Sequence, residues 1–230
     1  MTPTESPIDV QRSLGELVSE RPARARVLER AGLDYCCHGG RSLADAAAAA
    51  GVDVDALAVE LAAVADTAGA DVDQLAPVPL VDHILATHHE YLHEELPLLE
   101  ALAAKVRDVH GERHPELQEV AGLVAQVRAD LEPHLEREEQ VLFPAIRELP
   151  AGPAGPATVA EPIRVLMADH EVAGDLLEAL RSTTRDFVVP DDGCASYASL
   201  YQRLEQLEAD THRHVHLENN VLFPAVLGEP

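Results

Sequence analysis

The chain has 230 residues, 47% of them hydrophobic and 3% aromatic, and its formal net charge is −24. Such an acidic surface would repel phosphate backbones and anionic headgroups, so we expect no nucleic acid partner and no membrane partner. There is no apolar run of about 18 residues, and the N-terminus lacks the basic and apolar regions of a signal peptide. We therefore expect a cytoplasmic protein, and the dominance of Ala and Leu favours an all-α fold.

The first part of the chain predicts a small helical domain. Residues 1–9 are expected to form a disordered tail and residues 10–68 to form short helices. Pro22 suits the first turn of a helix, and Ser42 with Asp45 resembles a capping pair. The expected helices span residues 11–20, Pro22 to near Gly32, a stretch starting after Ser42, and residues 54–67.

A glycine-rich loop at residues 33–40 carries two adjacent cysteines, Cys36 and Cys37. Adjacent cysteines rarely bond to each other, because the small ring is strained. His38 and Arg41 stand close by in the sequence, just before a helix start, and would lower the pKa of both thiols. Redox chemistry, thiolate metal ligation, handling of an iron or sulfur species, and simple packing at a tight turn all remain open here.

Four long helices are expected after a proline-containing linker at residues 69–79. Gly and Pro interrupt the helical pattern between them, and the connections are short. This organisation is typical of an up-down four-helix bundle, here covering residues 80–227. The expected helices span residues 80–109, 115–147, 160–186 and 195–226.

The bundle sequence contains a duplicated hairpin. Residues 134–145 and 214–225 share a His, a Glu four positions later and a Val-Leu-Phe-Pro-Ala run. A His and a Glu at this spacing lie on one face of a helix. The preceding helix of each copy adds another His, at His89 and His170. The six candidate ligands are His89, His134, Glu138, His170, His214 and Glu218.

These six residues interrupt apolar seams that should face the core. The seam of the second bundle helix is Val127, Leu131, His134, Glu138, Val141 and Ala145, and that of the fourth is Leu207, Thr211, His214, Glu218, Val221 and Ala225. Burying these groups without partners would cost several kcal/mol for each charge. Imidazole and carboxylate without thiolate suit iron or manganese. We expect a dinuclear centre in which Glu138 and Glu218 bridge and each metal takes two His.

Other polar residues are harder to assign. Only the repeat distinguishes His89 from His88, and Cys194 is expected to be structural and without a partner. His212 and His216 step off the seam and are expected on the surface or behind the ligands. The carboxylates next to the ligands in sequence are candidates to orient them: Glu90, Asp130, Asp169 and Asp210. The histidines expected to be solvated are His83, His93, His110 and His114.

The Cys36-Cys37 pair before Gly39-Gly40, the stretch from Asp82 to Pro97 and the two His-x-x-x-Glu…Leu-Phe-Pro segments form a distinctive combination. Over residues 10–227 the chain resembles the iron–sulfur cluster repair di-iron proteins, the repair-of-iron-centres family. The resemblance implies a hemerythrin-like C-terminal bundle with a non-haem di-iron centre on the same six ligands, behind an N-terminal domain with a vicinal Cys pair. His38 departs from the family, where a Gly is more usual.

The resemblance implies repair of iron–sulfur clusters damaged by oxidative or nitrosative stress. Two iron ions, oxo- and carboxylate-bridged, would donate iron or handle nitric oxide, and Cys36 and Cys37 would serve redox or iron-transfer chemistry. Damaged iron–sulfur proteins would be the partners, and nitric oxide or oxygen the small ligands. A hemerythrin-like gas-binding sensor, a nitric oxide reductase and a metal-free or zinc-loaded bundle remain alternatives, so enzymatic activity is open. A homodimer through the small N-terminal domain is a further expectation.

Overall fold

The computed structural model describes residues 8–64, 72–149 and 155–228, and every regular element in these ranges is a helix. The expected all-α fold is confirmed. The chain forms two compact units, one made of residues 1–80 and 215–230, the other of residues 81–214. Residues 1–7 of the tail expected at residues 1–9, and the start of the expected linker, lie outside the described residues.

Short helices make up most of the first unit, and three of them, α1, α3 and α4, begin at a side-chain cap. Ser13 and Glu16 form a reciprocal capping box at the start of α1, and the Ser42 hydroxyl accepts a hydrogen bond from the Asp45 backbone N–H at 3.1 Å. Because each cap fixes where helical geometry begins, the first helix starts three residues later than expected. The helices are α1 (Leu14–Glu20), the 3₁₀ turn η1 (Pro22–Arg24), α2 (Ala25–Arg30), α3 (Leu43–Ala50) and α4 (Val54–Ala63).

Leucines from these helices form the core of the first unit, and the cysteine loop closes over it. Leu14, Leu28 and Leu43 are fully buried, with Tyr35 beside them. The backbone N–H of Gly15 donates to the carbonyl of Gly39 at 2.8 Å. A Cβ atom at Gly39 would lie only 2.5 Å from the carbonyl oxygen of Tyr35, so the loop needs glycine at this position.

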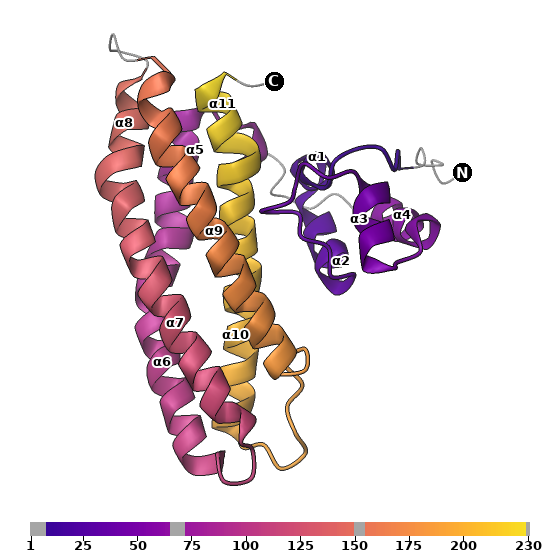
Figure 1. The fold of residues 1–230 in the computed structure, drawn as a ribbon, viewed down its shortest axis with the longest axis vertical. Helices are drawn as coiled ribbons and strands as arrows, with labels where there is room; N and C mark the ends of the chain where they lie inside the picture. The colour runs from indigo at the N-terminus through magenta and orange to yellow at the C-terminus, as the bar shows by residue number, and fades with distance from the viewer. Residues whose placement is uncertain (1–7, 65–71, 150–154, 229–230) are drawn as a thin grey trace. The chain divides into compact units, whose positions relative to one another are not determined.

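Four long helices run side by side in the up-down arrangement expected for the bundle (Figure 1). Leucines and valines at helical spacing line their inner faces and form one core. The short helix α5 (Pro77–Ile84) begins at Pro77, inside the stretch expected to be linker, since proline is well tolerated in a first helical turn. The long helices are α6 (Glu90–His110), α7 (Glu116–Arg137), α9 (Ala157–Thr183) and α10 (Ala195–Leu217).

Three π-helical turns interrupt the helices in the part of the chain that the structure describes. They are η3 (Leu85–His89), η4 (Glu138–Leu142) and η5 (Glu218–Leu222), and each has a candidate ligand at its first or last residue. In η4 the N–H of Phe143 donates to the carbonyl of Glu138, five residues back. The short helices α8 (Phe143–Glu148) and α11 (Phe223–Leu227) follow η4 and η5. Single π turns often occur at functional sites, and here they carry ligand candidates.

The π turns correct the expected core seam. Val141 is 56% exposed, whereas Leu142 and Ile146 are both 1% exposed. A π turn inserts one extra residue, so every apolar position after Glu138 moves by one. The second copy shows the same shift, with Leu222 and Val226 buried. Val141, Ala145, Val221 and Ala225 were therefore wrongly assigned to the seams.

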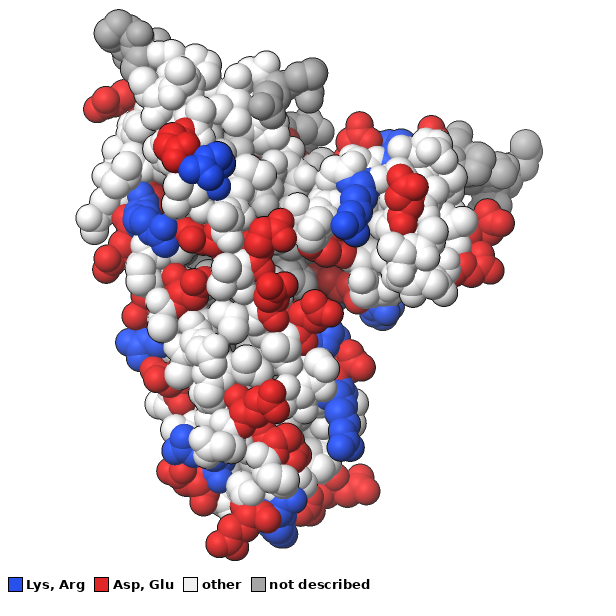
Figure 2. Space-filling model, in the orientation of Figure 1, with Lys and Arg blue, Asp and Glu red and all other residues white. Residues whose placement is uncertain are grey.

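Acidic side chains are spread over the face of the molecule shown in Figure 2, in keeping with the net charge of −24. Ion pairs hold some of them on the bundle, such as Arg203 with Glu95 at 2.6 Å. Among the described residues, no helix is both long enough and apolar enough to cross a membrane.

Candidate metal centre

Four helical segments of the bundle bring histidines together around one carboxylate. His89 ends η3, His134 lies in α7, His170 in α9 and His214 in α10. Each is 1% exposed, and Glu138 at the start of η4 is fully buried. The side chains reach this position because each stands on the inward face of its helix, where an apolar residue would otherwise pack.

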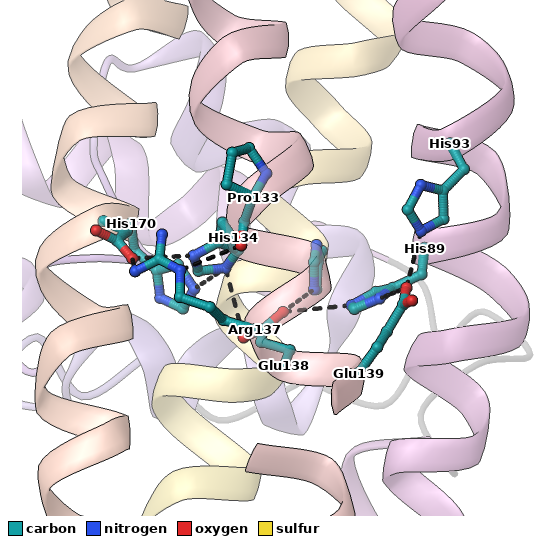
Figure 3. Close-up of polar contacts among 10 residues, drawn as sticks. His89, His93, Pro133, His134, Arg137, Glu138, Glu139 and His170 are labelled. Atoms are coloured by element: carbon teal, nitrogen blue, oxygen red, sulfur yellow. Dashed lines mark hydrogen bonds and ion pairs between the residues drawn. The ribbon is translucent and has the colours of Figure 1, made fainter. Parts of the chain in front are cut away.

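Glu138 lies between two groups of imidazoles (Figure 3). Its Oε2 is 3.4 Å from His89 Nε2 and 4.0 Å from His214 Nε2, while its Oε1 is 3.4 Å from His134 Nε2. His134 Nε2 is in turn 3.1 Å from His170 Nε2. The two carboxylate oxygens therefore face different histidines of the group.

The second carboxylate of the candidate set is Glu218, which starts η5 one turn after His214 and is fully buried. The ligand atoms of two four-residue groups lie within 4.8 Å of one another. These groups are His89, Glu138, His214 and Glu218, and His134, Glu138, His170 and Glu218. Both contain the same two carboxylates, and a buried set of imidazoles and carboxylates is the kind of site that holds non-haem iron.

Carboxylates behind the histidines fix the orientation of two rings. His89 Nδ1 lies 2.9 Å from Glu139 Oε1, and His93 Nε2 lies 2.8 Å from the same oxygen. His134 Nδ1 lies 3.4 Å from Asp169, which Arg137 also contacts at 2.9 Å. When Nδ1 donates outward, the Nε2 lone pair points into the centre, as a metal-binding imidazole needs.

Glu139 was not predicted from the sequence, because it is not repeated in the second copy of the hairpin. The equivalent position of the second copy is Asn219, so no duplication marks Glu139. Burial raises the pKa of Glu139, but hydrogen bonds from His93 and His89 outweigh it and lower the pKa below its usual value. His93 was expected to be solvated, and 43% of its side chain is exposed. It nevertheless contacts Glu139, the carboxylate that also contacts the candidate ligand His89.

His88 lies beside the candidate centre without joining either group. Its ring stacks on that of His214, with centroids 5.5 Å apart and planes 5° from parallel. Its Nδ1 is 2.9 Å from Asp210 Oδ1. Asp210 was a candidate to orient a ligand. In the structure it contacts His88, the residue before the candidate ligand His89.

The expectations that His110 is solvated and that Cys194 has no partner are both wrong. His110 is 5% exposed and its Nε2 lies 3.1 Å from Cys194 Sγ, so this His is not solvated and this Cys has a partner. His216 was expected on the surface or behind the ligands; it is fully buried, with Nε2 3.2 Å from the Ser19 hydroxyl, which leaves only the second of these positions. Sequence periodicity misses these contacts because each joins residues far apart in the chain.

The cysteine loop in the first unit is arranged around Asp34. The Asp34 Oδ1 atom accepts hydrogen bonds from the backbone N–H groups of Cys36 and Cys37, both at 2.9 Å. It also lies 3.1 Å from the Cys36 thiol, and Asp34 Oδ2 lies 2.5 Å from His38 Nδ1. The Cys36 thiol donates to the Cys37 sulfur at 3.8 Å, and no disulfide joins the two.

The expected lowering of the Cys36 thiol pKa is wrong. A hydrogen bond to Cys37 and burial raise the pKa of Cys36 well above its usual value, and the nearby Asp34 carboxylate raises it further. The expectation considered only the basic neighbours in sequence, whereas the structure turns the thiol toward a carboxylate. For Asp34, hydrogen bonds from Cys36, His38 and the backbone outweigh burial and lower the pKa.

Comparison with known proteins gives two family matches and a set of close relatives. Residues 80–226 match the Hemerythrin HHE cation binding domain, and residues 10–75 match a Domain of Unknown function (DUF542). The chain is 34% identical over 216 residues to the iron-sulfur cluster repair protein YtfE of Escherichia coli O1:K1, of E. coli SMS-3-5 and of Escherichia fergusonii. The matched region covers 94% of this chain and 96% of each relative.

Proposed function

The chain belongs to the family of hemerythrin-domain iron–sulfur cluster repair proteins, and we propose that it repairs damaged iron–sulfur clusters with iron held in its bundle. The observation that carries the proposal is the pair of buried four-residue groups that share Glu138 and Glu218. The 34% sequence identity to the YtfE relatives, which extends over 94% of the chain, supports the same role. Damaged iron–sulfur proteins are then the partners.

The proposed centre holds two iron ions. His89 and His214 would hold one ion, His134 and His170 would hold the other, and the carboxylates Glu138 and Glu218 belong to both groups. With so few protein ligands, such a ferrous pair would supply iron for transfer and would leave room for nitric oxide or oxygen. Four histidines, rather than the five of oxygen-carrying hemerythrins, favour release and reaction over reversible oxygen storage.

Neighbouring side chains orient and bury the proposed ligands. Glu139 holds the His89 ring and Asp169 lies against the His134 ring, so both Nε2 atoms point inward. Burial of all six groups keeps bulk water from competing with them. In the first unit, Cys36 and Cys37 are the proposed residues for passing iron on.

The proposal can be tested with anaerobically purified protein and a nitrosylated iron–sulfur protein as substrate. We expect about two iron ions per chain and recovery of the substrate's cluster absorption. The Glu138→Ala/Glu218→Ala protein should lose both. Glu178→Ala, at an exposed acid of α9, is the matched control and should keep both.

Each outcome of this test bears on a different function. Two irons without repair, together with a long-lived oxygen adduct, would replace repair with gas binding. Nitrous oxide above the apo-protein background after anaerobic mixing with nitric oxide would instead indicate a reductase. Zinc or no metal would show that the six residues have been misread.

A further inference from the structure

The cysteine loop carries a second cluster of metal-binding side chains, one that the proposed bundle centre does not use. Ligand atoms of Asp34, Cys36 and Cys37 lie within 4.8 Å of one another. His38 adds an imidazole that contacts the same carboxylate. All four belong to one short loop of the first unit, so local backbone geometry holds them together.

We propose that Asp34, Cys36 and Cys37 bind a single thiophilic metal ion and that His38 is the positioning residue for Asp34. The assignment of ferrous iron as the natural ion, held in passing toward a partner, rests on the proposed function. The metal site itself does not depend on that function.

The separation of the sulfurs fits a shared metal. Two thiolates bound to one tetrahedral ion at about 2.3 Å stand roughly 3.8 Å apart. The Cys36 and Cys37 sulfurs are 3.8 Å apart before any ion is added. A disulfide would require the sulfurs to approach to about 2 Å and would strain the ring that adjacent cysteines form. The loop is therefore already shaped for chelation.

Asp34 is held in place for this role. Two backbone N–H groups fix its Oδ1 beside the Cys36 sulfur, and His38 fixes its Oδ2. Metal-binding carboxylates are usually held by such outer contacts. The Cys36 thiol is buried against this carboxylate, where a lone thiolate would be unfavourable. A cation removes that repulsion, and one proton leaves each thiol as its sulfur binds the metal.

The loop backbone is anchored within the first unit. Asn220 Nδ2 donates to the carbonyl oxygens of Cys36 at 3.1 Å and Tyr35 at 3.4 Å, and Asn219 Nδ2 donates to that of Cys36 at 3.4 Å. These carbonyls adjoin the proposed ligands, so the amides restrict the movement of both sulfurs. Anchoring of this kind lowers the entropy lost on metal binding.

Three protein ligands leave a fourth position for an outside ligand. A cavity of about 190 Å³ lies beside the cluster, lined in part by Asp34, His38 and Arg41. Cys37 is half-buried and His38 is exposed, so the site is open on one side. A site with an open position suits an ion in transit, because an incoming thiolate can bind before the loop releases it.

The test uses cobalt(II) added anaerobically to the full-length, reduced protein. Thiolate-bound cobalt gives a near-ultraviolet charge-transfer band, and the bundle groups contain no thiolate, so this band reports on cobalt bound to cysteine and not on cobalt in the bundle. We expect a band whose full intensity corresponds to one thiolate-bound cobalt per chain. Cys36→Ser and Cys37→Ser should each remove most of it, and Asp34→Asn and His38→Ala should weaken cobalt binding by roughly tenfold or more.

Matched controls separate this proposal from the bundle centre. Cys194→Ser removes the third cysteine of the chain and should leave the band unchanged. Glu138→Ala/Glu218→Ala should also leave it unchanged even when bundle iron is lost, so the two proposals can fail separately. Circular dichroism shows which variants fold, and the half-buried Cys37 gives a variant that disturbs the core little.

Three results would overturn the site. The wild type could bind cobalt without a thiolate band, or the band could persist in the Cys36→Ser/Cys37→Ser protein. A mass loss of about two hydrogens with no cobalt binding under reducing conditions would show a vicinal disulfide in place of a metal site.

Discussion

The π turns that start at Glu138 and Glu218 occupy equivalent positions of the repeat but serve different neighbours. Both begin with a buried glutamate, and both end before a Phe-Pro pair. After Glu138 comes the carboxylate of Glu139, which accepts hydrogen bonds from two histidines. After Glu218 come two amides, which donate to carbonyls of the cysteine loop. The two copies share the candidate ligand and differ in the residues that follow it, so one turn orients a histidine and the other anchors a loop.

The largest expected effect comes from changing the shared glutamates one at a time. Glu138→Gln and Glu218→Gln keep the side-chain size but remove a carboxylate that both four-residue groups contain. Each variant should therefore fall from about two iron ions per chain to fewer than one. Iron analysis after anaerobic reconstitution measures this. If only one of the two variants lost iron, the turns would not be equivalent at the metal.

A smaller effect is expected when the first turn is given the sequence of the second. Glu139→Asn removes the carboxylate that holds the His89 ring, so iron affinity should fall roughly 10–100-fold. Competition with a ferrous chelator measures the affinity. His93→Ala is the matched control, because it removes the other contact of Glu139 and leaves that of His89. Equal losses in both variants would contradict a direct role of Glu139 in holding His89.

The reverse exchange tests the second turn. Asn220→Asp replaces a donating amide with a carboxylate that faces the carbonyls of Tyr35 and Cys36. Loss of these hydrogen bonds should destabilise the loop by about 1–3 kcal/mol, with bundle iron unchanged. Amide hydrogen exchange over residues 33–40 reports the loop, and Gln140→Asp is the control at the equivalent position of the first turn. Unchanged exchange in Asn220→Asp would contradict the anchoring role.

The smallest effect is a pH dependence centred on Asp34. The folded pKa of Asp34 is lowered from its model-compound value of 3.8. A lowered pKa means that the ionised carboxylate stabilises the fold above the unfolded pKa, and that this contribution is lost as the pH falls through the folded pKa. Thermal melts between pH 2 and about pH 5 should therefore show a steeper loss for wild type than for Asp34→Asn. Parallel curves would show that Asp34 contributes nothing to acid sensitivity.

The amino-acid sequence by itself determined the helical bundle and the cap at Ser42. It also singled out His89, His134, Glu138, His170, His214 and Glu218 as a set. These features are local or periodic: helical spacing brings a His and a Glu to one face, and duplication repeats the pattern. These features can therefore be predicted from the sequence without knowledge of any tertiary contact.

The tertiary structure alone decided the features that depend on partners distant in the chain. The π turns moved burial from Val141 to Leu142, because helix pairing selects which residue faces the core. Packing of the helices places Glu139 against His89, and it places His110 against Cys194. Cys36 turned toward Asp34 and became a weaker acid, against the expectation from its basic neighbours. Sequence periodicity predicts which face of a helix a residue occupies. Which residues it contacts there is decided by the packing of the helices.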